Sequence, residues 1–238
     1  MQEETRSYEG LRVGFTAAVS HELRTPLARL LALLDTAALP GADRDELLAQ
    51  AREEVEEMSE LVDEILFLSE LEDRRLESRG RTALAPVAAE VLSELRDRAE
   101  VADVELRADV APDFELPLRR RLARAVVENL AENAVRHAGG GAVFTLRASR
   151  EGNELVVVGT DTGRGIPRAE LPRLFERFYR GDRARASRGT GLGLAIVKHV
   201  VVSGGGTVVA SSGPGHGLTI RCAFPTDGRG RASAATRS

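Results

Sequence analysis

The N-terminal third of the chain is organised around one segment, which reads Ser20-His21-Glu22-Leu23-Arg24-Thr25-Pro26-Leu27. On a helix, with 100° per residue, the apolar side chains around this segment fall opposite His21. These side chains are Val19, Leu23, Pro26, Leu27, Leu30 and Leu34. His21 is therefore expected to face outward, with Thr25 one turn further along the same face and Glu22 beside both. A single exposed histidine on a helix is most often merely solvated. Beside a carboxylate, however, a neutral imidazole is also a good nucleophile.

Outward from this segment, residues 1–78 have a helical composition dominated by Leu, Ala, Glu and Arg, with one break at residues 39–43. We predict two long antiparallel helices, at about 5–38 and 44–78. Asp43 is the expected N-cap of the second helix, and Glu46, three residues later, completes the pattern of a capping box.

The second predicted helix carries an apolar seam with spacings of four, three, four and three residues, formed by Ala51, Val55, Met58, Val62 and Ile65. Such spacing is typical of helices that pack in a left-handed bundle. Two helices alone bury little apolar surface, so we expect the hairpin to pair with a second copy as a four-helix bundle. Docking of the hairpin onto the rest of the same chain is the simpler alternative.

The composition changes at Gly80, and Gly80-Arg81-Thr82 is interpreted as a linker. Apolar periodicity after it predicts helices at 86–101, 119–137 and 191–202. Predicted strands are Val104–Ala108, Ala142–Ser149, Glu154–Thr160, Gly206–Ser211 and Leu218–Phe224. Consecutive strands at the end favour a mixed α/β sandwich over a doubly wound parallel sheet. In the last strand, Leu218, Ile220, Cys222 and Phe224 share one face, so Cys222 is expected in the core. Residues 179–190 are expected to form a mobile loop, and residues 227–238 a disordered polar tail.

Composition limits the possible classes of protein. The 238 residues are 42% hydrophobic and 29% charged, which favours a folded domain, and the net charge is −4. There is thus no global basic excess to attract nucleic acid or an anionic membrane. The single cysteine excludes an intramolecular disulfide framework and a zinc cluster built on thiolates. No apolar run reaches the roughly 18–20 residues that span a bilayer, and no signal peptide is recognisable. The expectation is a soluble, cytoplasmic protein, or the cytoplasmic part of an inner-membrane protein.

Two amides mark the predicted helix at 119–137. Asn129 and Asn133 are four residues apart, so both project from one face. With an arginine nearby, paired amide oxygens suit a Mg²⁺ ion that phosphates and water hold for the most part. Helix capping or simple solvation is the commoner explanation for such a pair.

Two glycine-rich segments follow. Asp161-Thr162-Gly163-Arg164-Gly165-Ile166-Pro167 comes directly after a predicted strand, where alternate glycines let the backbone approach a flat ligand and the carboxylate can accept from an exocyclic amine. A plain turn before a helix explains it equally well. Gly189-Thr190-Gly191-Leu192-Gly193-Leu194 opens a predicted helix, where backbone N–H groups can bind phosphate. It is neither a Walker loop nor a dinucleotide fingerprint. Gly213–Gly217 is interpreted only as a turn.

Together these segments resemble the catalytic core of a bacterial two-component sensor histidine kinase. Residues 21–27 match the phosphoacceptor H-box, 129–137 the N-box, 161–165 the G1 box, 175–178 the F-box and 189–193 the G2 box. Their order and spacing match the family over about residues 10–226. His137 departs from the family pattern, because an aromatic residue such as Tyr is frequent at that position.

The resemblance implies a dimeric phosphoacceptor domain at 1–79, an ATP-binding α/β sandwich at 80–226 of the kind shared with gyrase and Hsp90, and a tail at 227–238. It implies that His21 accepts the γ-phosphate of ATP with Glu22 as base, and that Thr25 orients water for dephosphorylating a response regulator. Asn133, supported by Asn129, would bind Mg²⁺, Asp161 would read adenine, and residues 179–190 would form the ATP lid. The remaining implied nucleotide-binding residues are Arg136, His137, Gly163, Gly165, Ile166, Phe175, Arg177, Phe178, Gly189, Thr190, Gly191, Leu192 and Gly193.

Two other classes compete with a kinase that phosphorylates itself and then a response regulator. A plain ATP-driven machine would explain the sandwich but would leave His21 and the hairpin unused. A non-catalytic scaffold would have no use for the acceptor, the amides and the glycines.

Overall fold

The computed structural model describes residues 2–72, 80–181, 189–213 and 215–226, with side chains from residue 19 onward. The chain divides into two compact units, Met1–Leu66 and Phe67–Ser238. Three predicted segments lie outside the described residues: residues 73–78 at the end of the second predicted helix, residues 182–188 of the loop, and the tail at 227–238.

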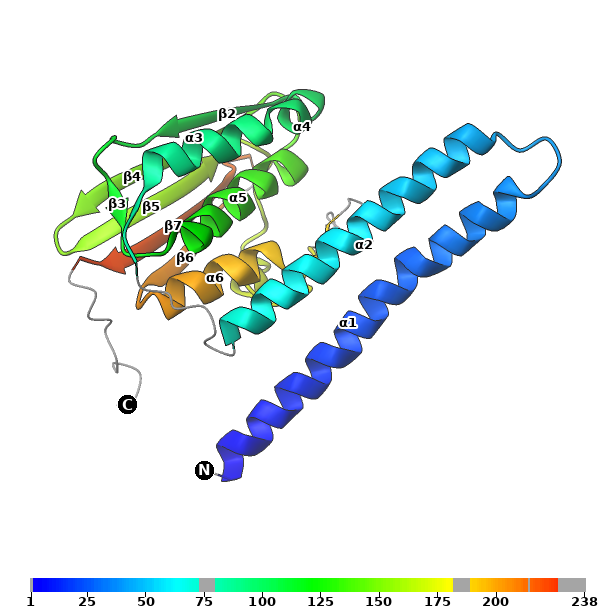
Figure 1. Ribbon diagram of the computed structural model, residues 1–238. Coiled ribbons are helices and arrows are strands. Elements are labelled where there is room, and N and C mark those ends of the chain that lie inside the picture. Colours follow the sequence, from blue (N-terminus) through cyan, green and yellow to red (C-terminus); the bar gives the residue numbers. More distant parts are fainter. Residues whose placement is uncertain (1, 73–79, 182–188, 214, 227–238) are drawn as a thin grey trace. The chain divides into compact units, whose positions relative to one another are not determined.

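The first unit is a helical hairpin, as predicted. Helix α1 spans Gln2–Ala37 with Pro26 inside it, and helix α2 spans Arg44–Glu72 and continues into the second unit (Figure 1). The N-cap at Asp43 is confirmed, because the backbone N–H of Glu46 donates to its Oδ1 at 3.2 Å. The capping-box interpretation of Glu46 is wrong: its Oε1 accepts from Gln50 Nε2 at 3.3 Å, so the side chain runs along the helix.

The predicted seam of α2 is only partly buried. Ala51 is buried and Met58 half-buried, whereas Val55 and Val62 are 48% and 41% exposed. At 100° per residue the five seam positions span only about 80°, but the buried positions Ala51, Glu54, Leu61 and Leu68 lie toward one side of that arc. Leu48, Val55 and Val62, seven residues apart, therefore form a second, exposed apolar row.

The second unit is the predicted mixed α/β sandwich. Its helices are α3 (Leu84–Glu94), α4 (Arg96–Val101), α5 (Arg120–His137) and α6 (Gly193–Ser203), with a 3₁₀ turn, η1, at Leu171–Arg173. Its large sheet contains β2 (Val104–Asp109), β4 (Ala142–Glu151), β5 (Glu154–Asp161), β6 (Thr207–Ser212) and β7 (Leu218–Pro225). The single helix predicted at 86–101 is two helices, because a ψ of −3° at Leu95 departs from helical geometry.

The sheet has the strand order β2-β4-β5-β7-β6. Only the β2–β4 pair is parallel, and the three other pairs are antiparallel. Helices α3, α5 and α6 lie on one face of the sheet (Figure 1). The predicted inward row of β7 is confirmed, since Leu218, Ile220, Cys222 and Phe224 are all buried. Burial raises the pKa of the Cys222 thiol to about 12, which keeps it protonated and unreactive.

A small second sheet pairs β1 (Thr82–Ala83) with β3 (Glu115–Leu116) in antiparallel register. The prediction that Thr82 belongs to a linker is wrong. Its side chain is buried, and its Oγ1 donates to the carbonyl of Leu118 at 2.7 Å. A two-residue strand has too little length to show an alternating pattern, so this pairing has no local signal.

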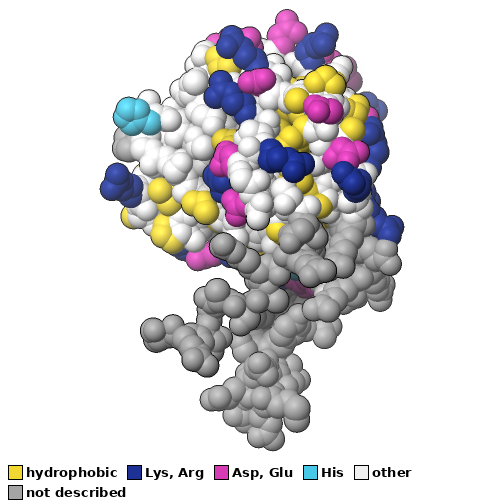
Figure 2. Space-filling view, turned by 90° about the vertical axis from the view of Figure 1, so that its left-hand side faces the viewer, with side chains coloured by type: hydrophobic (Ala, Val, Ile, Leu, Met, Phe, Trp, Pro, Cys, Tyr) yellow, Lys and Arg dark blue, Asp and Glu magenta, His cyan; other side chains and the backbone are white. Residues whose placement is uncertain are grey.

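No helix within the described ranges is long and apolar enough to cross a membrane. On the face of the molecule shown in Figure 2, acidic and basic side chains are interspersed with apolar ones.

Candidate functional site

His21 lies on the exposed face of α1, as predicted, with 77% of its side chain exposed. Glu22 Oε1 is 3.7 Å from His21 Nδ1. Thr25, one turn further along, donates its hydroxyl proton to the backbone carbonyl of His21 at 3.4 Å. A carboxylate beside Nδ1 favours the proton on that nitrogen, which leaves the Nε2 lone pair for a nucleophilic attack. The three side chains therefore lie together on the surface of α1, with His21 and Thr25 exposed.

The predicted pair of amides lies on α5, and one member faces the start of α6. Asn129 Nδ2 donates to the carbonyl of Ala125 at 2.8 Å, which leaves its Oδ1 to accept. A Cβ atom on Gly193 would lie only 2.5 Å from that Oδ1. Glycine is therefore needed where the N-terminus of α6 approaches the amide. Asn133, one turn further along α5, is half-buried, and its side chain makes no hydrogen bond within the described part of the chain.

The C-terminal turn of α5 is surrounded by positive charge. A Cβ atom on Gly189 would lie 3.2 Å from Arg136 Nη1, so this guanidinium lies against the glycine segment before α6. Burial, followed by the charges of Arg136, Arg180 and Arg164, lowers the pKa of His137 to about 4. His137 is thus a neutral ring at physiological pH, and the arginines near it favour an anionic ligand.

Asp161 ends β5 and is only 6% exposed. Its Oδ1 accepts from the backbone N–H groups of Gly163, at 2.8 Å, and Leu218, at 3.3 Å. Burial raises the pKa of Asp161, and these two hydrogen bonds oppose the rise. Among the described residues, none donates a hydrogen bond to Oδ2. A buried carboxylate with one oxygen held and the other open is suited to accept from an N–H group of a ligand.

Residues 213 and 215–217 belong to the predicted turn, which packs against residues 161–166. A Cβ atom on Gly165 would lie 2.1 Å from the carbonyl oxygen of Gly213, and one on Gly217 would lie 1.8 Å from that of Asp161. Gly163 approaches the backbone of Ala138 equally closely. The glycines of both segments thus allow the backbone contacts that hold the Asp161 loop in place.

The two ends of the predicted ATP lid meet. The backbone N–H of Phe178 donates to the carbonyl of Gly191 at 3.0 Å, and both residues have positive φ, 60° and 72°. Thr190 Oγ1 accepts from the N–H of Leu192 at 3.2 Å, so this turn ends two residues later than predicted and α6 begins at Gly193. Phe175 and Ile166 are half-buried.

Arg177, an implied nucleotide-binding residue, contacts the end of α2 in this structure. Its guanidinium forms an ion pair with Glu72, at the end of α2 and within the same compact unit. Within the described residues, no group of three or more His, Cys, Asp and Glu side chains could hold a metal ion.

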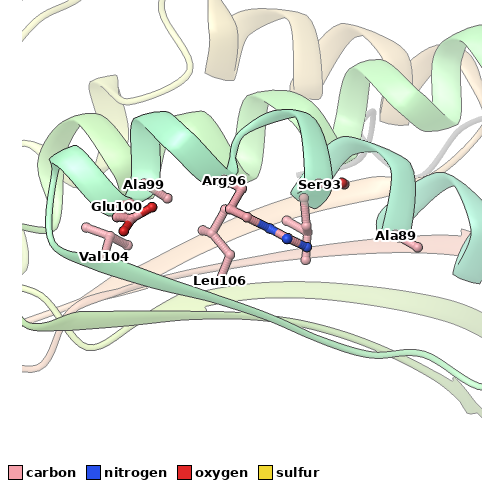
Figure 3. Close-up of a pocket in the computed structure, with 8 residues that line it drawn as sticks. Ala89, Ser93, Arg96, Ala99, Glu100, Val104 and Leu106 are labelled. Atoms are coloured by element: carbon pink, nitrogen blue, oxygen red, sulfur yellow. The ribbon is translucent and has the colours of Figure 1, made fainter.

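A hollow of about 360 Å³ lies elsewhere, between α3, α4 and β2. Figure 3 shows Ser93, Arg96 and Glu100 among its lining residues, with Leu106 of β2 on the opposite side. It shares no residue with the predicted site, and we assign it no ligand.

Two family models match the chain. One is described as the His Kinase A (phospho-acceptor) domain and matches residues 11–74. The other is described as the histidine kinase-, DNA gyrase B- and HSP90-like ATPase and matches residues 119–228.

Curated relatives match along almost the whole chain. The sensor-like histidine kinase SenX3 of Mycobacterium tuberculosis is 35% identical over 231 residues, covering 94% of this chain and 56% of the relative. The phosphate regulon sensor protein PhoR of Pseudomonas aeruginosa is 36% identical over 229 residues, which cover 91% of this chain and 50% of the relative. The chain thus spans about half the length of these relatives.

Solved structures share the fold. The histidine kinase AdeS of Acinetobacter baumannii superposes with a TM-score of 0.72 at 24% identity, covering 87% of this chain and 98% of that one. The histidine kinase ThkA, solved in complex with the response regulator protein TrrA, has a TM-score of 0.74 at 18% identity. The match covers 97% of this chain and 67% of that one.

Proposed function

Since this chain belongs to the histidine kinase family, we propose that it transfers the γ-phosphate of ATP to His21, and from there to an aspartate of a response regulator. The observation that carries this proposal is the pairing of two sets of residues in one chain. His21 is exposed with Glu22 beside Nδ1. Asp161 has one oxygen held by backbone N–H groups and the other open, and Asn129 of α5 lies against Gly193 at the start of α6.

The first transfer requires one bond to form and one to break. His21 Nε2 attacks the γ-phosphorus, the bond from that phosphorus to the bridging oxygen breaks, and ADP leaves. The phosphorylated imidazole is then cationic, with its proton on Nδ1, and Glu22 is placed to accept that proton. In the second transfer, a regulator carboxylate attacks the phosphorus and His21 leaves as a neutral imidazole once the proton returns.

The nucleotide is proposed to bind between α5 and α6. Asp161 accepts a hydrogen bond from the exocyclic amine of adenine, and the N-terminus of α6 presents backbone N–H groups to phosphate. Arg136 adds a positive charge, and His137 contributes a neutral ring. For Arg177 to bind phosphate, its ion pair with Glu72 must open.

The incubation of the full chain with γ-labelled ATP tests this function. Label that stays on the protein in alkali and is lost in acid identifies phosphohistidine. Release of phosphate without label on the protein would instead indicate an ATP-driven machine. If the protein neither keeps label nor releases phosphate, it is a scaffold.

Mg²⁺ is the proposed metal, and the residues present fit it. When bound, it would neutralise charge on the phosphates of ATP. Asn133, whose side chain has no hydrogen bond within the described part of the chain, is the proposed amide ligand, and Asn129 Oδ1 supports it from one turn away.

Asn133→Ala is expected to weaken Mg²⁺-dependent ATP binding by about ten- to a hundredfold, because it removes the ligand oxygen. Titrating nucleotide with and without Mg²⁺ measures the effect. A matched control is Asn153→Ala, at the exposed turn between β4 and β5. If the Mg²⁺ dependence of Asn133→Ala equals that of the wild type, Asn133 does not bind the metal.

The hairpin is proposed to form a homodimer. Within the described side chains of α1 and α2, seven large apolar ones are 41–61% exposed in the single chain: Leu27, Leu31, Leu34, Leu48, Val55, Val62 and Leu66. Burial of such rows against a second copy would complete a four-helix bundle. Light scattering on the full chain should give twice the mass of one chain.

We further propose that the response regulator binds near the exposed His21, as a regulator protein binds the related kinase ThkA. Both transfers need cytoplasmic ATP and a cytoplasmic partner, so the core is proposed to act in the cytoplasm. Residues 1–79 and 80–226 are the proposed phosphoacceptor and ATP-binding domains.

Thr25 and Glu22 are proposed to divide two activities between them. Thr25→Ala should lower dephosphorylation of the regulator more than autophosphorylation, because its hydroxyl is placed to orient water one turn from His21. Glu22→Ala should show the reverse, because it removes the proton acceptor. Rates of both reactions are measured on both variants. If Thr25→Ala lowers dephosphorylation and autophosphorylation equally, Thr25 only shapes the helix before Pro26.

A further inference from the structure

Ser212 is a side chain that neither the sequence patterns nor the family roles described above account for. It is the last residue of β6 and is half-buried. Its hydroxyl donates to the carbonyl of Gly217 at 2.5 Å and accepts from the backbone N–H of Ile166 at 2.7 Å. Because the hydroxyl is both donor and acceptor, its orientation is fixed by two different loops.

These two loops also exchange backbone hydrogen bonds. The N–H of Gly217 donates to the carbonyl of Gly163, and the N–H of Gly215 donates to that of Arg164, both at 2.9 Å. The next residue, Leu218, donates to Asp161 Oδ1. The hydroxyl of Ser212 thus lies behind the turn that supplies one of the two donors to Asp161, and it joins that turn to Ile166.

We infer that Ser212 is a positioning residue for adenine recognition, acting through Asp161 and not through contact with the nucleotide. The two loops supply the two N–H groups that donate to Asp161 Oδ1, and these two hydrogen bonds fix the orientation of the carboxylate and therefore of Oδ2. The hydroxyl of Ser212 keeps the two loops in register. The inference rests on the proposed function, since it assumes that Asp161 reads the adenine of ATP.

Removing the hydroxyl leaves the N–H of Ile166 and the carbonyl of Gly217 without their partner, and Gly217 is buried. Unpaired buried groups are unfavourable, so both loops are expected to shift until water or new partners reach these groups. A shift of this kind misplaces Oδ2 against the adenine amine. It leaves the N-terminus of α6 and the phosphate end of the site unchanged.

The neighbouring residue provides a matched control. Ser211 belongs to the same strand but is exposed on the opposite face, and its side chain makes no hydrogen bond within the described residues. The experiment therefore compares Ser212→Ala, Ser212→Thr and Ser211→Ala in the full chain. Dissociation constants of ATP and GTP are measured by calorimetry, and the rate of autophosphorylation is measured at saturating ATP.

For Ser212→Ala, we expect ATP binding to weaken about tenfold and GTP binding to change much less, so that the preference for ATP shrinks. The rate at saturating ATP should stay within about twofold, because the phosphate end of the site is intact. Ser212→Thr, which keeps the hydroxyl, should restore the preference, and Ser211→Ala should match the wild type. If Ser212→Ala does not fold, Ser212→Cys, which has a weaker donor of similar size, takes its place with the same expectation.

Two results would overturn the inference: an unchanged preference in Ser212→Ala, or equal losses for ATP and GTP, which would indicate a general structural role. A wild-type chain that binds no ATP would overturn the proposed function as well. A wild-type chain that binds ATP in preference to GTP, with an unchanged Ser212→Ala, would overturn the positioning role alone.

Discussion

Replacing His21 with Gln is expected to abolish autophosphorylation while leaving ATP binding unchanged. Glutamine keeps a polar, exposed side chain on α1 but has no lone pair on a ring nitrogen to attack phosphorus. The proposed nucleotide site is built from β5, α5 and α6 of the second unit, so its affinity does not depend on this side chain. The measurements are retained label after incubation with γ-labelled ATP, and the dissociation constant of ATP.

His199→Gln is the matched control, because it removes a half-buried histidine of α6 that has no proposed role. It should retain the label. Label on the His21→Gln protein at the wild-type level would show that another residue accepts the phosphoryl group.

Asp161→Asn is expected to weaken ATP binding by at least about a hundredfold. To keep its hydrogen bonds from Gly163 and Leu218, the new side chain must place its amide oxygen at the position of Oδ1. Its NH₂ group then occupies the position of Oδ2, where a donor meets the exocyclic amine of adenine. Two facing donors leave both groups unpaired, which a buried site penalises strongly.

The affinity of Asp161→Asn is measured by calorimetry, and its melting temperature is measured alongside to show that the fold survives. Asp109→Asn, at the exposed end of β2, is the control and should bind ATP as the wild type does. The same assignment requires the wild type to prefer ATP over GTP. Equal affinities for the two nucleotides would contradict it.

Most helices and strands were predictable because their signals are local. The break at 39–43, the cap at Asp43 and the alternation in β7 each depend on residues within a few positions of one another. The prediction failed where a long-range contact decides the structure. Thr82 has no strand signal around it, and its hydroxyl partner, Leu118, lies 36 residues away. The seam of α2 has the right spacing, but which of its residues face α1 depends on how the two helices pack.

The sequence alone determined the chemistry of the candidate site: an outward histidine beside a carboxylate, two amides on one helix face, and an aspartate among glycines. Residue type and helical or strand period are local properties, so they can be read in order along the chain. Only the tertiary structure decided how that chemistry is held. Ser212 meets Ile166 across 46 residues, and Leu218 meets Asp161 across 57. Arg177 is paired with Glu72, 105 residues earlier. Such contacts form because buried polar groups require partners, and the fold alone decides which partners come within reach.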